Sequence, residues 1–157
     1  MAITKIWTVK SRLNSSLKYI ANPDKTSIQP DLDAVEGVMK YIKNGDKTEQ
    51  CKYVKAYNCT TDKAFSEMLE TQEFFGKSGR KNGVLAYHLV QSFKDFETTP
   101  EIAHRCGQEL VERLFADKYE AVIATHLDHK HLHNHLIINS VSYADGYKYR
   151  NNFKDYF

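Results

Sequence analysis

The strongest constraint on the fold comes from residues 119 to 143, where two apolar segments follow each other with only a short polar turn between them. Tyr119 to Leu127 and Leu132 to Tyr143 have the apolar, β-branched composition that is typical of strands. Strands this close in sequence pair as an antiparallel hairpin, because a parallel pair needs a long crossover connection. We therefore expect a sheet that is at least partly antiparallel.

The rest of the chain predicts further strands and several helices. Alternating or continuous apolar runs indicate the strands, while capping residues and glycines indicate where helices begin and end. Further strands are expected at Ala2 to Lys10, Lys52 to Cys59 and Val84 to Phe93, with a short final strand at Tyr147 to Arg150. Helices are expected after Asn14-Ser15-Ser16, from Pro30 to about Tyr41, from a cap at Thr60-Thr61-Asp62 to Gly76, and from Thr99-Pro100 onward. This order predicts one α+β domain, with a mainly antiparallel central sheet of about five strands flanked by helices.

Composition indicates the compartment of the protein, but it does not identify a binding partner. A formal net charge of +2 on 157 residues does not by itself indicate nucleic acid, although the first 30 residues are distinctly basic. Three cysteines without paired spacing argue against a disulfide framework and favour a reducing compartment. The chain starts without the apolar run of a signal peptide, and no segment is apolar for long enough to span a membrane. We therefore expect a cytoplasmic protein with no membrane segment.

Five of the seven histidines lie between residues 126 and 135. If the hairpin turns at residues 129 and 130, strand alternation places His126, His133 and His135 on one face, with residue 126 opposite residue 133. Three imidazoles at this spacing can hold one divalent cation and leave coordination positions open, which is what a catalytic metal needs. Asp128 is the natural hydrogen-bond partner of a ligating imidazole. Asn139 points to the same face and is a further candidate neighbour.

The other histidines have simpler interpretations. His129 and His131 are assigned to the exposed turn with no role. His104, on a helix, is expected at the surface. His88 lies inside an apolar strand, so we expect a hydrogen-bonded core histidine, with a role behind the metal site or facing DNA as the alternative. A histidine-rich surface tract that binds metal adventitiously is the plain alternative for the whole cluster.

The spacing H-x-D-x4-H-x-H-x3-N, from His126 to Asn139, resembles the third motif of MobP-type conjugative relaxases. These enzymes form the relaxase/mobilization nuclease family of the HUH endonucleases. The strand VLAYHLVQSF with the following Thr98-Thr99-Pro100 resembles the second motif, and SLKYIANPDKT resembles the first, which carries the family's nucleophilic tyrosine. That position is Tyr19 here. The sequence departs from the pattern at Asn134, where the family has a hydrophobic residue.

The resemblance implies site- and strand-specific nicking of single-stranded or hairpin DNA at a transfer origin, in the cytoplasm of a bacterium. Tyr19 would attack the phosphodiester and form a 5′-phosphotyrosyl intermediate, which initiates transfer of a plasmid or integrative element. Asp128 would support catalysis, and His126 would act as metal ligand or as base. Tyr41, Tyr53 and Tyr57 are the fallback nucleophiles.

Cofactor and DNA contacts follow from the same resemblance. Intrinsic affinity ranks Ni²⁺, Cu²⁺ or Zn²⁺ above Mn²⁺ and Mg²⁺ on three imidazoles, while availability in the cell favours Mn²⁺ or Mg²⁺ as the working ion. Purified protein is expected to carry whatever ion the preparation supplied, Ni²⁺ or Zn²⁺ included. Lys and Arg of the first segment would bind DNA phosphates, and hydroxyls after the second motif would hold the 3′ side of the nick, with Ser78 and Ser92 as competing hydroxyls. The expected DNA-binding residues are Arg12, Lys18, Lys25, Thr98, Thr99 and Asn139.

Several alternatives stay open at this point. A non-catalytic DNA-binding module with a relic metal site would bind DNA without cleaving it. A rolling-circle replication initiator of the same superfamily would carry its tyrosine after the histidines. A zinc hydrolase of small substrates would act without DNA. Residues 1 to 157 are expected to form the relaxase domain at the start of a longer protein, with accessory relaxosome proteins and a coupling protein as implied partners.

Overall fold

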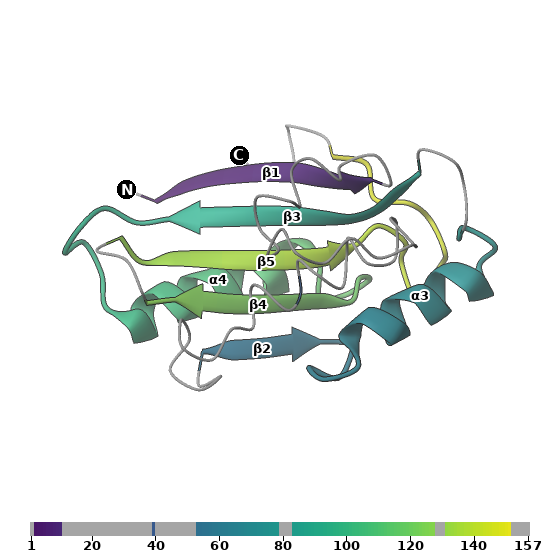
Figure 1. Ribbon diagram of the computed structural model, residues 1–157, viewed down its shortest axis with the longest axis horizontal. Helices are drawn as coiled ribbons and strands as arrows, with labels where there is room; N and C mark the ends of the chain where they lie inside the picture. The colour runs from purple at the N-terminus through teal and green to yellow at the C-terminus, as the bar shows by residue number, and fades with distance from the viewer. Residues whose placement is uncertain (1, 11–38, 40–52, 79–82, 128–130, 152–157) are drawn as a thin grey trace, which may run out of the picture.

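The described part of the chain forms a five-stranded antiparallel sheet with two helices, as the α+β expectation required. The computed structural model describes residues 2–10, 39, 53–78, 83–127 and 131–151. The strand order is β1-β3-β5-β4-β2, so β1 and β2 form the two edges (Figure 1). The strands are β1 (Ile3–Lys10), β2 (Val54–Tyr57), β3 (Val84–Ser92), β4 (Ala121–His126) and β5 (His133–Asn139), and the helices are α3 (Ala64–Phe74) and α4 (Pro100–Leu114). The helices expected between residues 11 and 52 lie outside the described residues.

The hairpin of β4 and β5 is the centre of the structure. Its register pairs His126 with His133, as predicted from the turn position. β3 lies on the other side of β5, where Ser92 pairs with His133 and Val90 with His135. The strand that carries two of the histidines is therefore covered along both edges by backbone hydrogen bonds, which holds its side chains in a fixed register.

The two faces of the sheet have different covers. α4 crosses behind β4 and β5 in Figure 1, and its Val111 packs with Leu89, Ile123 and Leu136 of the far face. α3 lies at the end of the sheet where β5 ends, and its Met68 packs on the near face with Ile137. Side chains alternate between faces along each strand, so the near face is the one that carries His126, His133 and His135.

The two helices begin in different ways. Thr99 caps α4 as predicted, since its hydroxyl accepts a hydrogen bond from the Ile102 amide and Pro100 opens the first turn. The predicted cap at residues 60 to 62 is wrong, because α3 starts at Ala64 after Lys63 without a side-chain cap. Thr60 instead donates its hydroxyl hydrogen to Glu67, 3.0 Å away, which ties the preceding loop to the first turn of α3.

The end of α3 agrees with the prediction, whereas the expected final strand is shorter than predicted. Gly76 adopts a positive φ of 63° just after α3, in agreement with the predicted stop. The expected final strand at residues 147 to 150 is reduced to a single bridge between Val141 and Lys148. Within the described residues, neither helix is long and apolar enough to cross a membrane.

Candidate metal and DNA-cleavage site

Three histidines converge where β4 ends and β5 begins. His126 is the last residue of β4, and His133 and His135 occupy alternate positions of β5 on the same face. Each ring offers one nitrogen, and these three atoms lie within 4.8 Å of one another. The ring centroids are 4.3 to 5.2 Å apart. His126 and His135 are buried and His133 is half-buried, so the cluster is closed on the β4 side and open beyond His133.

Hydrogen bonds define which nitrogen of each ring faces the cluster. The Nδ1 of His133 lies 3.1 Å from the backbone carbonyl of His131. A carbonyl only accepts, so this Nδ1 carries the proton and the lone pair is on Nε2. The Nδ1 of His135 lies 2.9 Å from the Nε2 of His88, which leaves the Nε2 of His135 as the nitrogen that can serve as a ligand.

His88 is the site residue whose role the sequence left open. It lies on β3 with 7% of its surface exposed, and its ring stands 5.1 Å from that of His135. Burial and, secondarily, the charge of His126 lower the pKa of His88 to about 4. His88 is therefore neutral near pH 7, and in the tautomer with its proton on Nδ1 its Nε2 can accept a hydrogen bond from the Nδ1 of His135. The β3–β5 register creates this contact, and no local sequence pattern encodes that register.

The donor set fits a divalent transition metal. Neutral imidazoles are common ligands for such ions, and a ligating histidine usually donates its second N–H to a fixed partner. His133 and His135 have such partners in the carbonyl of His131 and the ring of His88. Metal–nitrogen bonds of about 2.1 Å in a tetrahedral site place neighbouring ligand atoms about 3.4 Å apart, so the three rings would have to move closer together to bind one ion.

A polar network on the opposite face anchors the strand between the two β5 histidines. Asn134 has no exposed surface, and its amide donates to the carbonyl of Ala103 on α4 and to Gln91 on β3, at 2.7 and 2.8 Å. Its oxygen accepts from the Thr125 hydroxyl at 2.6 Å. That hydroxyl has one hydrogen, so it accepts from His104, which lies 2.8 Å away. His104 is thus half-buried in this network, and the expectation of a surface residue is wrong.

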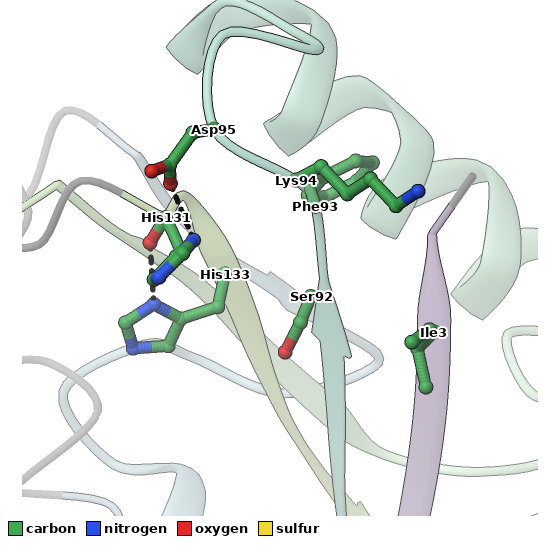
Figure 2. Close-up of a pocket in the computed structure, with 7 residues that line it drawn as sticks. All are labelled: Ile3, Ser92, Phe93, Lys94, Asp95, His131 and His133. Carbon is green, nitrogen blue, oxygen red and sulfur yellow. Dashed lines mark hydrogen bonds and ion pairs between the residues drawn. The ribbon is translucent and has the colours of Figure 1, made fainter.

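An open cavity of about 620 Å³ adjoins the histidines. Figure 2 shows Ile3, Ser92 and His133 on the same side of the sheet, from the adjacent strands β1, β3 and β5. At the rim, His131 makes a close ion-pair contact with Asp95 of the loop after β3. His131 is exposed, as expected for the turn, and this contact joins the hairpin end to that loop.

Several known proteins are similar in sequence to this chain. Residues 41–157 match the family described as "Relaxase: MobA/VirD2-like, nuclease domain". This chain belongs to the MobA/VirD2-like relaxase family. The group II intron-interrupted relaxase LtrB of Lactococcus lactis subsp. cremoris is 35% identical over 139 residues, which is 87% of this chain and 24% of LtrB. A protein rlx of Staphylococcus aureus is 40% identical over 97 residues, 62% of this chain and 30% of that protein. The matched part is thus less than a third of the length of these curated relatives.

The family match covers only some of the expected site residues. The three histidines fall within residues 41–157, whereas Tyr19, Arg12, Lys18 and Lys25 precede that range. These four residues and Asp128 also lie outside the described residues. Their roles remain predictions from the first and third motifs.

The structure places two of the fallback tyrosines of the relaxase domain away from the histidines. Tyr53 is buried and donates its hydroxyl hydrogen to Glu101 of α4 at 2.7 Å. Tyr57 donates its hydroxyl hydrogen to Glu112 of α4 at 2.9 Å. Burial, and to a smaller extent this acidic neighbour, raises the pKa of Tyr57 above its ordinary value. Both hydroxyls therefore face the α4 side of the sheet. Tyr41 lies outside the described residues.

The structure places the expected DNA-contacting hydroxyls at different distances from the histidines. Thr99 uses its hydroxyl to cap α4, and the Thr98 hydroxyl lies 3.4 Å from the carbonyl of Thr99. Neither residue lines the cavity beside the histidines. Ser92 does, and it is the register partner of His133. Ser92 is thus the competing hydroxyl that lies beside the histidines, while the contacts of Thr98 and Thr99 with DNA remain predictions.

Asn139 lies on the predicted face of β5, but it is buried at a distance from the histidines. It has no exposed surface and lies four residues beyond His135, at the α3 end of β5. Its amide donates to Glu120 at 2.7 Å and to the carbonyl of Met68 at 3.1 Å, and its oxygen accepts from Gln72 at 2.9 Å. A side chain enclosed in this way joins α3 to the sheet, and direct contact with DNA does not fit its position.

Proposed function

We propose that this chain is the nuclease domain of a relaxase that nicks single-stranded DNA at a transfer origin in a metal-dependent, site- and strand-specific manner. The observation that carries the proposal is the cluster of three imidazole nitrogens within 4.8 Å, beside an open cavity, in a chain of the relaxase family. Such nicking would initiate mobilization of a plasmid or integrative element. LtrB is named a relaxase, which supports the assignment.

In this proposal, His126, His133 and His135 hold one divalent ion. When bound by three neutral ligands, the ion keeps its full charge and can neutralise the oxygens of the scissile phosphate. Mn²⁺ or Mg²⁺ is the proposed working ion, with Ni²⁺ or Zn²⁺ in purified protein. The burial of His126 and its ring distance of 4.3 Å to His135 favour a ligand over a base.

The proposed nucleophile is Tyr19. Its oxygen would form a bond to phosphorus while the bond from phosphorus to the 3′ oxygen breaks, which leaves a 5′-phosphotyrosyl link and a free 3′-hydroxyl. A phenol has a pKa near 10, so a base must remove its proton or a nearby cation must stabilise the phenolate, and the departing 3′ oxygen takes up a proton to become the hydroxyl. Asp128 would orient a ligating histidine, and Arg12, Lys18 and Lys25 would bind phosphates around Tyr19. Ser92, in place of Thr98 and Thr99, would hold the 3′ side of the nick.

The test is a covalent protein–DNA adduct. Single-stranded oligonucleotides tiled across the DNA that flanks the gene would be incubated with the protein and Mn²⁺, then separated under denaturing conditions. We expect an adduct with one oligonucleotide that disappears in EDTA and in Tyr19→Phe, while Tyr53→Phe retains it. An adduct that persists in Tyr19→Phe would refute the nucleophile, and DNA binding without any adduct would support a non-catalytic module instead.

A further inference from the structure

The near face of the sheet becomes more exposed from β4 toward β1. The registers align side chains in rows across the strands, and one row runs from His126 through His133 and Ser92 to Ile3. Along this row, exposure rises from 0% at His126 to 59% at Ile3. The open approach to the histidines is therefore from the side of β1.

Two parallel rows repeat this gradient. In one, His135 is followed by half-buried Val90 and then by exposed Lys5. In the next, Ile137 and His88 are buried, whereas Trp7 is 48% exposed. β1 lies two strands from β5, which is roughly 10 Å at ordinary strand spacing. The near face of β1 thus presents an isoleucine, a lysine and a tryptophan beside the proposed site.

We propose that Ile3, Lys5 and Trp7, here called the β1 strip, bind single-stranded DNA as it leads to the histidines, with a base stacked on Trp7 and a phosphate at Lys5. This inference rests on the proposed function in taking single-stranded DNA as the substrate. The cavity supports it by continuity, since its lining runs from Ile3 through Ser92 to His133.

The chemistry of the β1 strip favours single-stranded nucleic acid over other occupants. Aromatic side chains that alternate with cations are typical of grooves that bind single strands, because bases stack on the rings while phosphates meet the charges. The bases of a duplex are already stacked on one another, so an exposed indole cannot stack on them. A protein partner is disfavoured by the lysine at the middle of the strip, because lysine is depleted from the core of protein interfaces.

Trp7 is also held in place for such a role. Its ring centroid lies 5.8 Å from that of His88, with the planes tilted by 50°. His88 is buried and contacts His135 in turn. The indole therefore has a fixed support on its inner side, and stacking a base on its exposed surface requires little further ordering of the side chain.

Trp7 is the only tryptophan of the chain, so intrinsic fluorescence reports on it alone. We would titrate the protein with a mixed-sequence single-stranded oligonucleotide in EDTA, which separates binding from cleavage. We expect saturable quenching, and a Trp7→Ala variant that binds the labelled oligonucleotide about 5- to 150-fold more weakly by anisotropy. Trp7→Phe should retain most of the affinity. Phe74→Ala, at an exposed position on α3, is the matched control and should bind normally.

The salt dependence separates the two contacts. Lys5→Gln should reduce the slope of log K against log salt by about 0.7, as expected for one phosphate contact on a single strand, whereas Trp7→Ala should leave the slope unchanged. Circular dichroism would establish that each variant is folded.

The outcomes distinguish this proposal from the proposed function. Normal adduct formation together with unquenched fluorescence and normal DNA affinity in Trp7→Ala would overturn the role of the β1 strip and leave the relaxase proposal standing. Loss of self-association in Trp7→Ala, measured by sedimentation and without a change in DNA binding, would also overturn it. Quenching and weakened binding without any covalent adduct would support the β1 strip and count against nicking.

Discussion

The two ends of β5 carry polar side chains on the same face but in opposite circumstances. At one end, His133 and His135 meet His126 beside an open cavity, and their ring nitrogens converge on each other. At the other end, Asn139 is enclosed by Gln72, Glu120 and the backbone of α3. Sharing a face of a strand therefore does not give residues a shared function. What distinguishes the two ends is that Asn139 is fully enclosed, whereas the histidines adjoin an open cavity.

The comparison predicts its largest effect at the histidine end. His133→Ala removes one of three proposed ligands and should weaken Mn²⁺ or Zn²⁺ binding by more than about 100-fold, since even outer partners of a ligand contribute 10- to 100-fold. Isothermal titration calorimetry on metal-free protein measures this directly. Thermal stability of the metal-free variant should change little, because His133 is only half-buried. Unchanged metal affinity would remove His133 from the site.

The opposite pattern is predicted at the other end of the strand. Asn139→Ala removes one hydrogen bond from the buried carboxylate of Glu120 and one from the amide of Gln72. We expect the free energy of unfolding to fall by about 3 kcal/mol, because both groups stay buried with one partner fewer. Urea denaturation of the metal-free protein gives this value. Metal affinity of the folded variant should match the wild type. A variant of normal stability that binds DNA poorly would reverse our interpretation of Asn139.

His88 provides a finer test, because it touches the site without being a proposed ligand. His88→Leu should weaken metal binding 10- to 100-fold by removing the acceptor for the Nδ1 proton of His135. His88→Gln keeps an acceptor and should restore part of the affinity. His104→Leu is the control, since His104 contacts Thr125 on the other face. Equal losses in both His88 variants would indicate a packing role alone.

The smallest predicted effect is a pH dependence at the Asn139 end. Burial, outweighing hydrogen bonds from Asn139 and Thr71, raises the pKa of Glu120 above its ordinary value. The folded state therefore binds this proton more tightly than the unfolded state does. The resulting stabilisation is present below the unfolded pKa and is lost as pH rises through the folded pKa. The difference between the urea midpoints of the wild type and Glu120→Gln should therefore fall as pH rises from 4 to 7. A difference that stays constant over this pH range would show that Glu120 does not titrate in this way.

Sequence reasoning succeeded where the determining contacts are local. The period of two along a strand and a short turn were enough to pair His126 with His133 and to bring His135 beside them. Thr99 and Pro100 likewise marked the start of α4, because capping depends on residues within one turn.

The features that the sequence could not specify arise where distant segments meet. The burial of Asn139 depends on α3, whose Gln72 lies 67 residues earlier in the chain. The contact of His88 with His135 requires the β3–β5 register, and His104 is half-buried only because Thr125 and Asn134 continue the network beneath it.

The proposed reaction requires Tyr19 to meet the three histidines, which lie more than a hundred residues later in the sequence. The most direct measurement is mass spectrometry of the covalent adduct after digestion with protease and nuclease. We predict a 5′-phosphonucleotide on the peptide that contains Tyr19, formed only when a divalent metal is present and absent from His133→Ala. A nucleotide attached to another residue, or an adduct that forms equally well in EDTA, would contradict the central claim.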